Sequence, residues 1–280
     1  MSKIILGTAQ FGKGYGISCD TEKSAFSKFN KIKKICSDEK IDTADISDKY
    51  YNLFVYNKLK KTFKKKIYKI SDITNKNFKK KIDKIIYSEN DAYCIMIHNP
   101  SILKKKFFLN VVDYLIKRKN ERRFRKIGIS IYNIEEFWHS IKVFGKNLDI
   151  IQLPINIIDR RFLQKKIVNK IKKEGIEIHA RSVFLQGMLI MKIRPAYFDK
   201  WKFFFRNWDK EKKLDKINIC LNFIKKIKFI DKVIVGSEDE KQLKYTVNFL
   251  KKKIKNTKIY NYKNFYSKEL NLINPTKWII

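Results

Sequence analysis

Residues 92–131, AYCIMIHNPSILKKKFFLNVVDYLIKRKNERRFRKIGISI, contain the pattern that decides the fold. The stretch opens with Ala92–His98, an almost entirely apolar run that is typical of a strand buried on both faces. The residues that follow place a set of apolar side chains on one face of a helix: Leu103, Phe107, Val111, Val112 and Leu115. Lys126–Ile131 then predicts the next strand. A strand, a helix and a strand at this spacing predict a right-handed βαβ unit with parallel strands.

The same alternation extends over most of the chain. Further strands are predicted at Lys3–Thr8, Ile41–Ala44, Ile67–Ile73, Ile150–Ile155, Ile176–Val183 and Val233–Gly236. Eight such units favour an α/β fold closed into a single-domain (β/α)8 TIM barrel over an open doubly wound sheet. We expect the barrel to occupy residues 1–256, with an extended segment, Gln186–Lys232, between the last two strands. Residues 257–280 are expected to form a C-terminal tail.

The charge of the chain is strongly positive, with a formal net charge of +36 over 280 residues. Such a charge suggests a polyanionic partner. The excess is nearly all lysine, however, and it is spread over every helical segment together with abundant Ile, Asn, Phe and Tyr. A genome rich in A and T codons explains this composition more simply. We therefore expect no dedicated nucleic-acid partner, although nonspecific binding to RNA remains an expectation.

The four cysteines and the apolar runs indicate the compartment. Cys19, Cys36, Cys94 and Cys220 lie far apart and form no C-x-x-C pair, so we expect reduced thiols and no metal site. The N-terminus lacks an apolar segment long enough for a signal peptide, and no apolar run reaches transmembrane length. These features predict a cytoplasmic protein with no membrane partner.

Polar residues interrupt the apolar runs where the predicted strands end. They are Asp42, Asp45, His98, Ser130, Gln152, Arg181, Ser182, Gly236 and Ser237. In a β/α barrel the carboxyl ends of all strands meet at one face, where active sites are built. A lone histidine in an apolar run is commonly a core residue, but the position of His98 before Asn99-Pro100 favours a functional role. The convergence of these strand ends predicts one active site.

Seven segments, in this order, resemble the motifs of the aldo-keto reductase family. They are Leu6–Gly12, Ile41–Ala44, Ile97–Pro100, Gly128–Asn133, Ile151–Asn156, Ala180–Gly187 and Val233–Gly236. The Arg-Ser-Val-Phe-Leu-Gln-Gly form is similar to a bacterial branch associated with sugar and cell-envelope metabolism. The resemblance implies hydride transfer from NADPH or NADH to a small carbonyl or sugar-derived substrate. In the family a tyrosine donates the proton, and a lysine, an aspartate and a histidine tune and position it.

Transferred to this sequence, the resemblance assigns Asp42 and His98 to the catalytic aspartate and histidine. The tyrosine is expected five residues after the aspartate, at Ser47, and the lysine at about Ile73, so the resemblance implies that both are replaced. Lys69 shares strand parity with Ile73 but would lie about 13 Å deeper.

Two replacements for the missing acid are open. In the first, the side chain of Tyr50 or Tyr51 reaches back into the pocket and donates the proton. In the second, His98, with an unperturbed pKa near 6.5, is itself the acid. The alternative function is a catalytically degenerate barrel that binds a nucleotide or a partner protein.

The cofactor-binding residues implied by the resemblance are better preserved. Ser130 and Gln152 would hold the nicotinamide carboxamide, and Gly7 and Thr8 would border its ribose. The rest of the cofactor would lie along residues at the ends of the last two strands: Arg181, Ser182, Gly187, Gly236, Ser237 and Gln242. Gln242 stands where the family reads a phosphate, and it follows the acidic run Glu238–Glu240. Both NADP and NAD are therefore compatible with the sequence.

Overall fold

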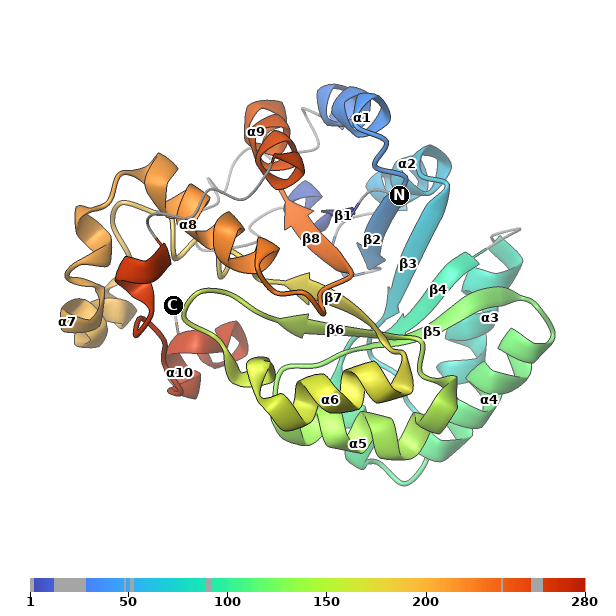
Figure 1. The fold of residues 1–280 in the computed structure, drawn as a ribbon. Coiled ribbons are helices and arrows are strands. Elements are labelled where there is room, and N and C mark those ends of the chain that lie inside the picture. Colours follow the sequence, from blue (N-terminus) through green and yellow to red (C-terminus); the bar gives the residue numbers. More distant parts are fainter. Residues whose placement is uncertain are drawn as a thin grey trace.

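The computed structural model describes residues 3–12, 29–47, 49–50, 53–88, 92–237, 239–252 and 259–279. Eight parallel strands form one closed barrel in sequence order, with the last strand paired to the first (Figure 1). The strands are β1 (Ile4–Gly7), β2 (Thr43–Ser47), β3 (Lys65–Ile70), β4 (Ala92–Ile97), β5 (Phe124–Ser130), β6 (Ile150–Pro154), β7 (Glu177–Arg181) and β8 (Lys232–Gly236). This arrangement confirms the predicted (β/α)8 TIM barrel.

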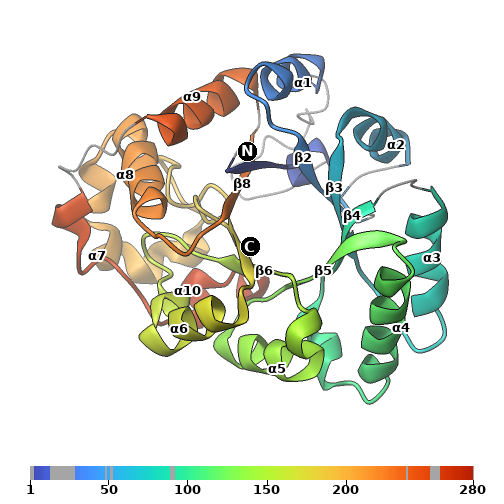
Figure 2. The same ribbon diagram turned by 45° about the vertical axis from the view of Figure 1, so that its right-hand side comes forward.

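Helices form a ring outside the strands (Figure 2). The long ones are α1 (Phe29–Asp38), α2 (Leu53–Thr62), α3 (Phe78–Ser88), α4 (Phe108–Asn120), α5 (Ile134–Phe144), α6 (Lys165–Glu174), α8 (Lys213–Lys225) and α9 (Glu240–Lys251). Helix α6 shows how the lysines are accommodated, because it buries Ile167 and Ile171 and turns most of its lysines outward. Among the described residues, no helix is long and apolar enough to cross a membrane.

The barrel interior contains an apolar layer between two polar ones. Its middle is filled by Ile5, Ile67, Cys94, Met96 and Ile150. Towards the amino ends of the strands, Lys126 forms an ion pair with Glu177, and Glu177 contacts the buried ring of His179. Towards the carboxyl ends lie Asp45, Lys69 and Gln152, all buried. The interior is thus a packed core whose upper polar layer faces the pocket described below.

Strands β2 and β3 end at residues that differ from the predicted ones. Strand β2 continues to Ser47, three residues beyond the predicted end, and β3 ends at Ile70, three residues before it. Asp45 and Ser47 interrupt the apolar run of β2, so the apolar pattern stops before the strand does. Parallel pairing places Ser47 opposite Lys69. Lys69 therefore lies one residue from the carboxyl end of its strand.

The segment between β7 and β8 packs against the C-terminal residues. It includes the short helix α7 (Lys202–Phe205) and the buried indole of Trp208, and the tail contributes α10 (Leu270–Ile273) (Figure 1). The rings of Tyr262 and Phe265 lie 5.0 and 5.1 Å from that of Trp208. Aromatic stacking thus joins the tail to the rest of the molecule.

Three of the four cysteines lie in the described part of the chain. Cys36, Cys94 and Cys220 are free and buried, and Cys19 lies outside the described residues. Burial raises the pKa of the Cys36 thiol to about 12. Within the described part of the chain, no group of His, Cys, Asp or Glu side chains could hold a metal ion.

Candidate active site

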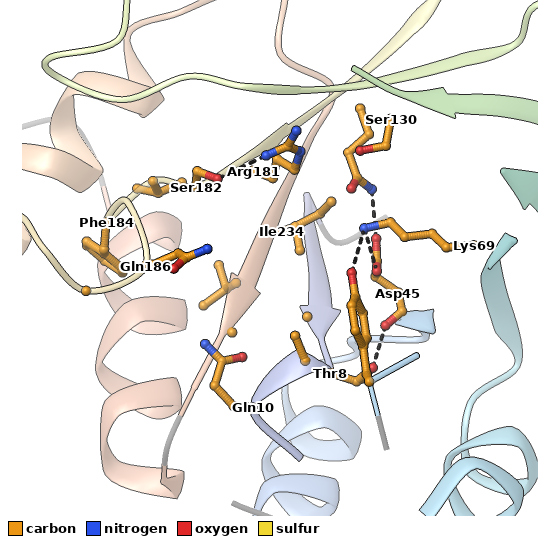
Figure 3. A pocket seen from close by; sticks show the side chains of 18 of the residues that line it. Thr8, Gln10, Asp45, Lys69, Ser130, Arg181, Ser182, Phe184, Gln186 and Ile234 are labelled. Carbon is orange, nitrogen blue, oxygen red and sulfur yellow. Dashed lines mark hydrogen bonds and ion pairs between the residues drawn. The ribbon is translucent and has the colours of Figure 1, made fainter. Parts of the chain in front are cut away.

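A cavity of about 390 Å³ opens at the carboxyl ends of the strands (Figure 3). Its walls come from the ends of all strands and from the loops after them, as expected for a β/α barrel. The residues that bear on function are Gly7, Thr8, Asp45, Lys49, Tyr50, Lys69, His98, Ser130, Tyr132, Gln152, Arg181, Ser182, Gly187, Gly236 and Gln242.

Four titratable side chains form a continuous polar chain in one wall. The Lys69 ammonium lies 2.9 Å from an oxygen of Asp45, and both side chains are buried. Lys69 Nζ donates a hydrogen bond to the hydroxyl of Tyr50 at 3.3 Å. That hydroxyl lies 3.4 Å from Nε2 of His98, and the two rings meet edge to face. The arrangement brings together an acid, a cation, a carboxylate and an imidazole.

The prediction that Asp42 belongs to this site is wrong. Asp42 precedes β2 and forms an ion pair with Lys65, at the start of β3, at 2.9 Å. It lines a separate cavity with Cys36 and Lys64. The reason is the end of β2: Asp45, not Asp42, reaches the carboxyl end of the barrel. Asp45 also stands five residues before Tyr50, the same spacing that the resemblance placed on Asp42 and Ser47.

The expectation that the tyrosine and lysine are replaced is also corrected. Tyr50 and Lys69 occupy the pocket, whereas Ile73 follows β3 and packs against the core outside the barrel. Lys69 is not too deep, because β3 ends only one residue after it. Ser47 is buried beside the site, with its hydroxyl 3.4 Å from Nδ1 of His98. Tyr51 lies outside the described residues.

Burial and charge decide the protonation of His98. Burial, followed by the charges of Lys69, Arg181 and Lys49, lowers the pKa of His98 from 6.5 to about 3. The imidazole is therefore neutral at physiological pH, which argues against His98 as the proton donor. Ser71 Oγ lies 2.8 Å from Nδ1 and fixes the ring. Burial also lowers the pKa of Lys69, while the adjacent Asp45 favours its charged form.

The residues expected to bind a cofactor gather along the same cavity. All of them line it except Ser237, whose hydroxyl donates to the side-chain oxygen of Gln242 at 3.1 Å. Ser130 and Gln152 are neighbours across β5 and β6. Gln152 donates to Asp45 at 2.7 Å, and its buried Oε1 has no hydrogen-bond partner among the described residues. An unpaired buried acceptor in a cavity wall is suited to a ligand N–H group.

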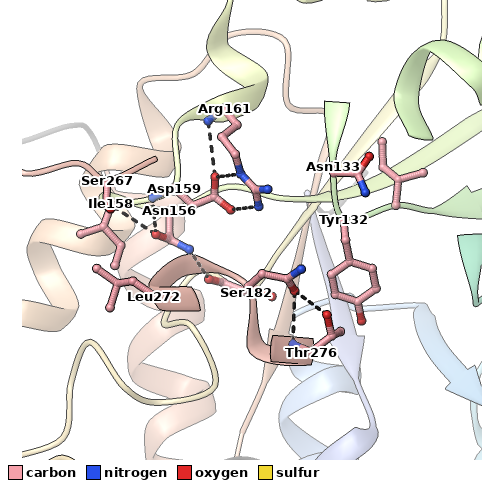
Figure 4. Close-up of polar contacts among 12 residues, drawn as sticks. Tyr132, Asn133, Asn156, Ile158, Asp159, Arg161, Ser182, Ser267, Leu272 and Thr276 are labelled. Carbon is pink, nitrogen blue, oxygen red and sulfur yellow. Dashed lines mark hydrogen bonds and ion pairs between the residues drawn. The ribbon is translucent and has the colours of Figure 1, made fainter. Parts of the chain in front are cut away.

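The loop after β7 has an unusual backbone conformation. Ser182, Leu185 and Gln186 have φ values of 59°, 48° and 53°, in the left-handed region that non-glycine residues rarely adopt. The side chain of Asn156 donates to the carbonyl of Ser182 at 3.1 Å and so holds the start of the loop (Figure 4). Such strain is concentrated at ligand sites. The role of Asn156 was missed by the sequence argument.

Other residues of the site were also missed or rejected. Asp45 was noted only as a polar strand end, and Lys69 was rejected on depth. The five-residue spacing from Asp45 to Tyr50 is a signal that could have identified the aspartate. No local signal marks Lys49 or Ser71, because only the fold brings them near His98.

Comparison with known proteins agrees with this architecture. The holo form of an aldo-keto reductase from Bacillus halodurans superposes with a TM-score of 0.69 at 14% identity, covering 93% of this chain and 90% of that one. The glycerol dehydrogenase of Gluconobacter oxydans gives a TM-score of 0.67 at 14% identity, covering 100% of this chain and 94% of that one. At these identities the likeness shows the fold.

Comparison by sequence places the chain in a family. No curated protein matches the chain. The model of the aldo/keto reductase family, however, matches residues 3–266. This match covers almost the whole chain and includes every strand and long helix of the barrel. The chain therefore belongs to the aldo/keto reductase family.

Proposed function

We propose that the protein is an oxidoreductase that uses NADPH or NADH to reduce a small carbonyl or sugar-derived substrate, with Tyr50 as the proton donor. The observation that carries the proposal is the position of the Tyr50 hydroxyl, between Lys69 Nζ at 3.3 Å and His98 Nε2 at 3.4 Å. A carbonyl oxygen that becomes an alkoxide needs an acid within hydrogen-bond reach. Tyr50 is such an acid in the wall of the cavity.

Each of the other three side chains has a role in the proposal. The charge of Lys69 stabilises the phenolate that remains when Tyr50 gives up its proton. Asp45 compensates the burial of that charge and holds Lys69 in place at 2.9 Å. Neutral His98 orients the carbonyl oxygen by a hydrogen bond, in the tautomer in which the Ser71 hydroxyl donates to Nδ1 and Nε2 carries the proton.

The residues of the cavity fit a nicotinamide dinucleotide. Such a cofactor supplies the hydride when bound. Gln152 Oε1 is an acceptor without a partner, suited to the N–H of a carboxamide. At the cavity wall, a Cβ on Gly7 would come within 3.1 Å of the backbone nitrogen of Gly236, so glycine permits the close approach of β1 and β8 there.

The proposal includes both NADPH and NADH. The acids that follow β8 have local partners: Asp239 caps α9 by accepting from the Gln242 amide at 2.8 Å, and Glu240 pairs with Lys31 at 3.4 Å. Glu238 lies outside the described residues. The acids thus have structural reasons to be present, and they do not by themselves select against a phosphate.

The degenerate-barrel alternative rested on the replacement of the tyrosine and lysine by Ser47 and Ile73. The presence of Tyr50 and Lys69 in the cavity wall supports the reductase over that alternative. No other observation favours it.

The test is a calorimetric titration of the protein with NADPH and then NADH, followed by a screen of small aldehydes, ketones and sugars monitored by nicotinamide absorbance. Saturable binding and turnover of at least one carbonyl are expected. Absence of binding for both cofactors would contradict the proposal. Binding without turnover of any carbonyl would restore the degenerate-barrel alternative.

A further inference from the structure

The charges around the cavity are unbalanced. Of the described residues that line it, three are cationic, Lys49, Lys69 and Arg181, and one is a carboxylate, Asp45. The formal sum is therefore +2, because His98 is neutral. Lys69 and Asp45 neutralise each other as a buried pair. The excess positive charge belongs to Arg181 and Lys49.

Arg181 is held rigidly but is not neutralised by an acid. One Nη group donates to the carbonyl of Ile131 at 2.8 Å, and the other to the hydroxyl of Ser182 at 3.3 Å. The guanidinium lies 4.0 Å from the centre of the Tyr132 ring. Among the described residues the contacts of its guanidinium are with the Ile131 carbonyl, the Ser182 hydroxyl and the Tyr132 ring and include no carboxylate, and its buried Nε has no hydrogen-bond acceptor. A fixed, stacked guanidinium without a counterion is suited to bind an oxyanion.

Lys49 supplies a second, mobile cation at the rim. It is 51% exposed and forms an ion pair with Asp72, itself 63% exposed, at 2.7 Å. Exposed pairs of this kind contribute little free energy, so Lys49 is able to exchange Asp72 for a ligand. The charges of Lys49 and Arg181 both act on His98, so both cations lie near the polar chain that His98 forms with Tyr50, Lys69 and Asp45.

Arg181 lies at the start of the loop that is expected to hold the cofactor phosphates, on its side toward Ser130. In Figure 3, Phe184 lies on the far side of Ser182 from Lys69, whereas Arg181 lies between Ser182 and Ser130. The loop after β7 and the start of α9 also line the cavity. The charge of Arg181 therefore acts on the catalytic side chains His98 and Lys69 and lies beside the cofactor-binding residues.

We propose that the substrate is a carbonyl compound bearing a carboxylate or phosphate group, which Arg181 binds in the pocket and Lys49 assists at its mouth. This inference names the substrate class of the proposed active site and rests on that proposed function. It reassigns Arg181, which the resemblance grouped with the cofactor residues, to the substrate. The cavity, of about 390 Å³, must also accept part of the cofactor, so the substrate is small. Binding of the anion also returns the local charge towards neutrality.

The test compares each anionic substrate with a neutral counterpart that carries the same aldehyde group. Succinate semialdehyde is paired with its methyl ester, and glycolaldehyde phosphate with glycolaldehyde, which distinguishes a carboxylate from a phosphate. The measured quantity is the ratio of kcat/KM for the anion to that for its neutral counterpart. In the wild-type protein at least one ratio is expected to be about 100, the effect of one well-placed charge pair. Arg181→Gln should bring that ratio close to one.

Three further variants serve as comparisons. Arg181→Lys keeps the charge without the planar fork and should give an intermediate ratio. Lys49→Gln should lower the ratio about threefold, as expected for an exposed charge. Lys146→Gln removes the same charge at the amino-terminal end of the barrel and should leave the ratio unchanged. The thermal midpoint of each variant shows whether it is folded.

Failure of this inference is distinguishable from failure of the proposed function. Equal kcat/KM values for both members of each pair would overturn the anionic substrate while leaving the reductase intact. A weaker binding of NADPH by Arg181→Gln, with an unchanged ratio, would assign Arg181 to the cofactor. If no aldehyde is reduced, calorimetric titration with succinate and with inorganic phosphate decides whether the anion site exists. Saturable binding that Arg181→Gln abolishes would support the anion site, and no binding would refute it.

Discussion

At the scale of single residues, the buried ion pair of Lys69 and Asp45 organises the site. A buried pair is rarely retained for stability, since the loss of hydration of both ions opposes their attraction. Here the pair also holds the ammonium next to the hydroxyl of Tyr50. Gln152 donates to the same carboxylate and fixes its orientation. The pair is best understood as a device that positions a cation beside an acid.

Replacing Tyr50 by phenylalanine tests that view. Tyr50→Phe removes only the hydroxyl, so we expect kcat for carbonyl reduction to fall by about 10²- to 10⁴-fold. Calorimetry should show that the affinity for the nicotinamide cofactor is retained. Tyr93→Phe, which removes a hydroxyl at the other end of the barrel, is the matched control. A wild-type rate in Tyr50→Phe would assign proton donation to another group.

The low pKa of His98 predicts how stability depends on pH. The unfolded imidazole binds a proton below about pH 6.5, whereas the folded one does so only near pH 3. The contribution of His98 is thus fully present above pH 6.5 and is lost as the pH falls from 6.5 towards 3, by at most about 1.4 kcal/mol per pH unit. Urea unfolding between about pH 7 and 5 should show this slope, reduced in His98→Gln. Parallel slopes for the two proteins would refute the prediction.

At the scale of elements, the N-terminus of α5 links helix capping to the pocket. The side chain of Asn133 accepts from the amide of Glu136 at 2.9 Å, and Glu136 accepts in return from the amide of Asn133 at 3.0 Å. The same Glu136 carboxylate also accepts from the amide of Tyr132 at 2.6 Å. The ring of Tyr132 packs against the guanidinium of Arg181. The capping box therefore fixes the backbone beside the proposed anion site.

Loss of this cap should be measurable. Asn133→Ala is expected to lower the free energy of unfolding by about 1 kcal/mol. The amide of Glu136 loses its acceptor, and the reciprocal bond from the amide of Asn133 to Glu136 is weakened with it. Asn147→Ala removes an amide that caps nothing and should change it by less than about 0.5 kcal/mol. Urea denaturation measures both. Equal effects of the two substitutions would show that the cap contributes no specific stability.

At the scale of the whole molecule, Arg160 fastens the C-terminal residues to the barrel. Its guanidinium donates to the carbonyls of Tyr262 at 2.9 Å, Lys263 at 2.7 Å and Phe265 at 3.3 Å. It also donates to the carbonyl of Ile157, in the loop after β6, at 2.8 Å. One side chain thus joins two segments about a hundred residues apart.

Removal of Arg160 should release the tail locally. In Arg160→Met, we expect trypsin to cleave at Lys263 and Lys268 at least about 10-fold faster, since the local opening free energy falls with the lost hydrogen bonds. Arg206→Met, at an exposed arginine of the segment between β7 and β8, is the control. Limited proteolysis with mass spectrometry locates the cuts. Unchanged cleavage would mean that aromatic packing around Trp208 alone secures the tail.

Much of the fold and part of the site were determined by the sequence alone. Apolar runs at regular spacing predict eight βα units, because strands buried on both faces and amphipathic helices leave strong periodic patterns. His98, Ser130 and Gln152 could be assigned to the pocket because each lies at or near the end of such a run. In β4 and β5 the apolar pattern and the strand end together, so local sequence was sufficient there.

Only the tertiary structure decided which aspartate and which lysine face the cavity. Asp45 and Lys69 are polar residues inside strands, so they interrupt the apolar pattern from which strand ends are predicted. Their level in the barrel is set by the pairing of Gly7 with Asp45 and of Ser47 with Lys69. A shift of three residues moves a side chain by about 10 Å and reverses its face. Register depends on hydrogen bonds between segments distant in the chain, and no local pattern in β2 or β3 records it.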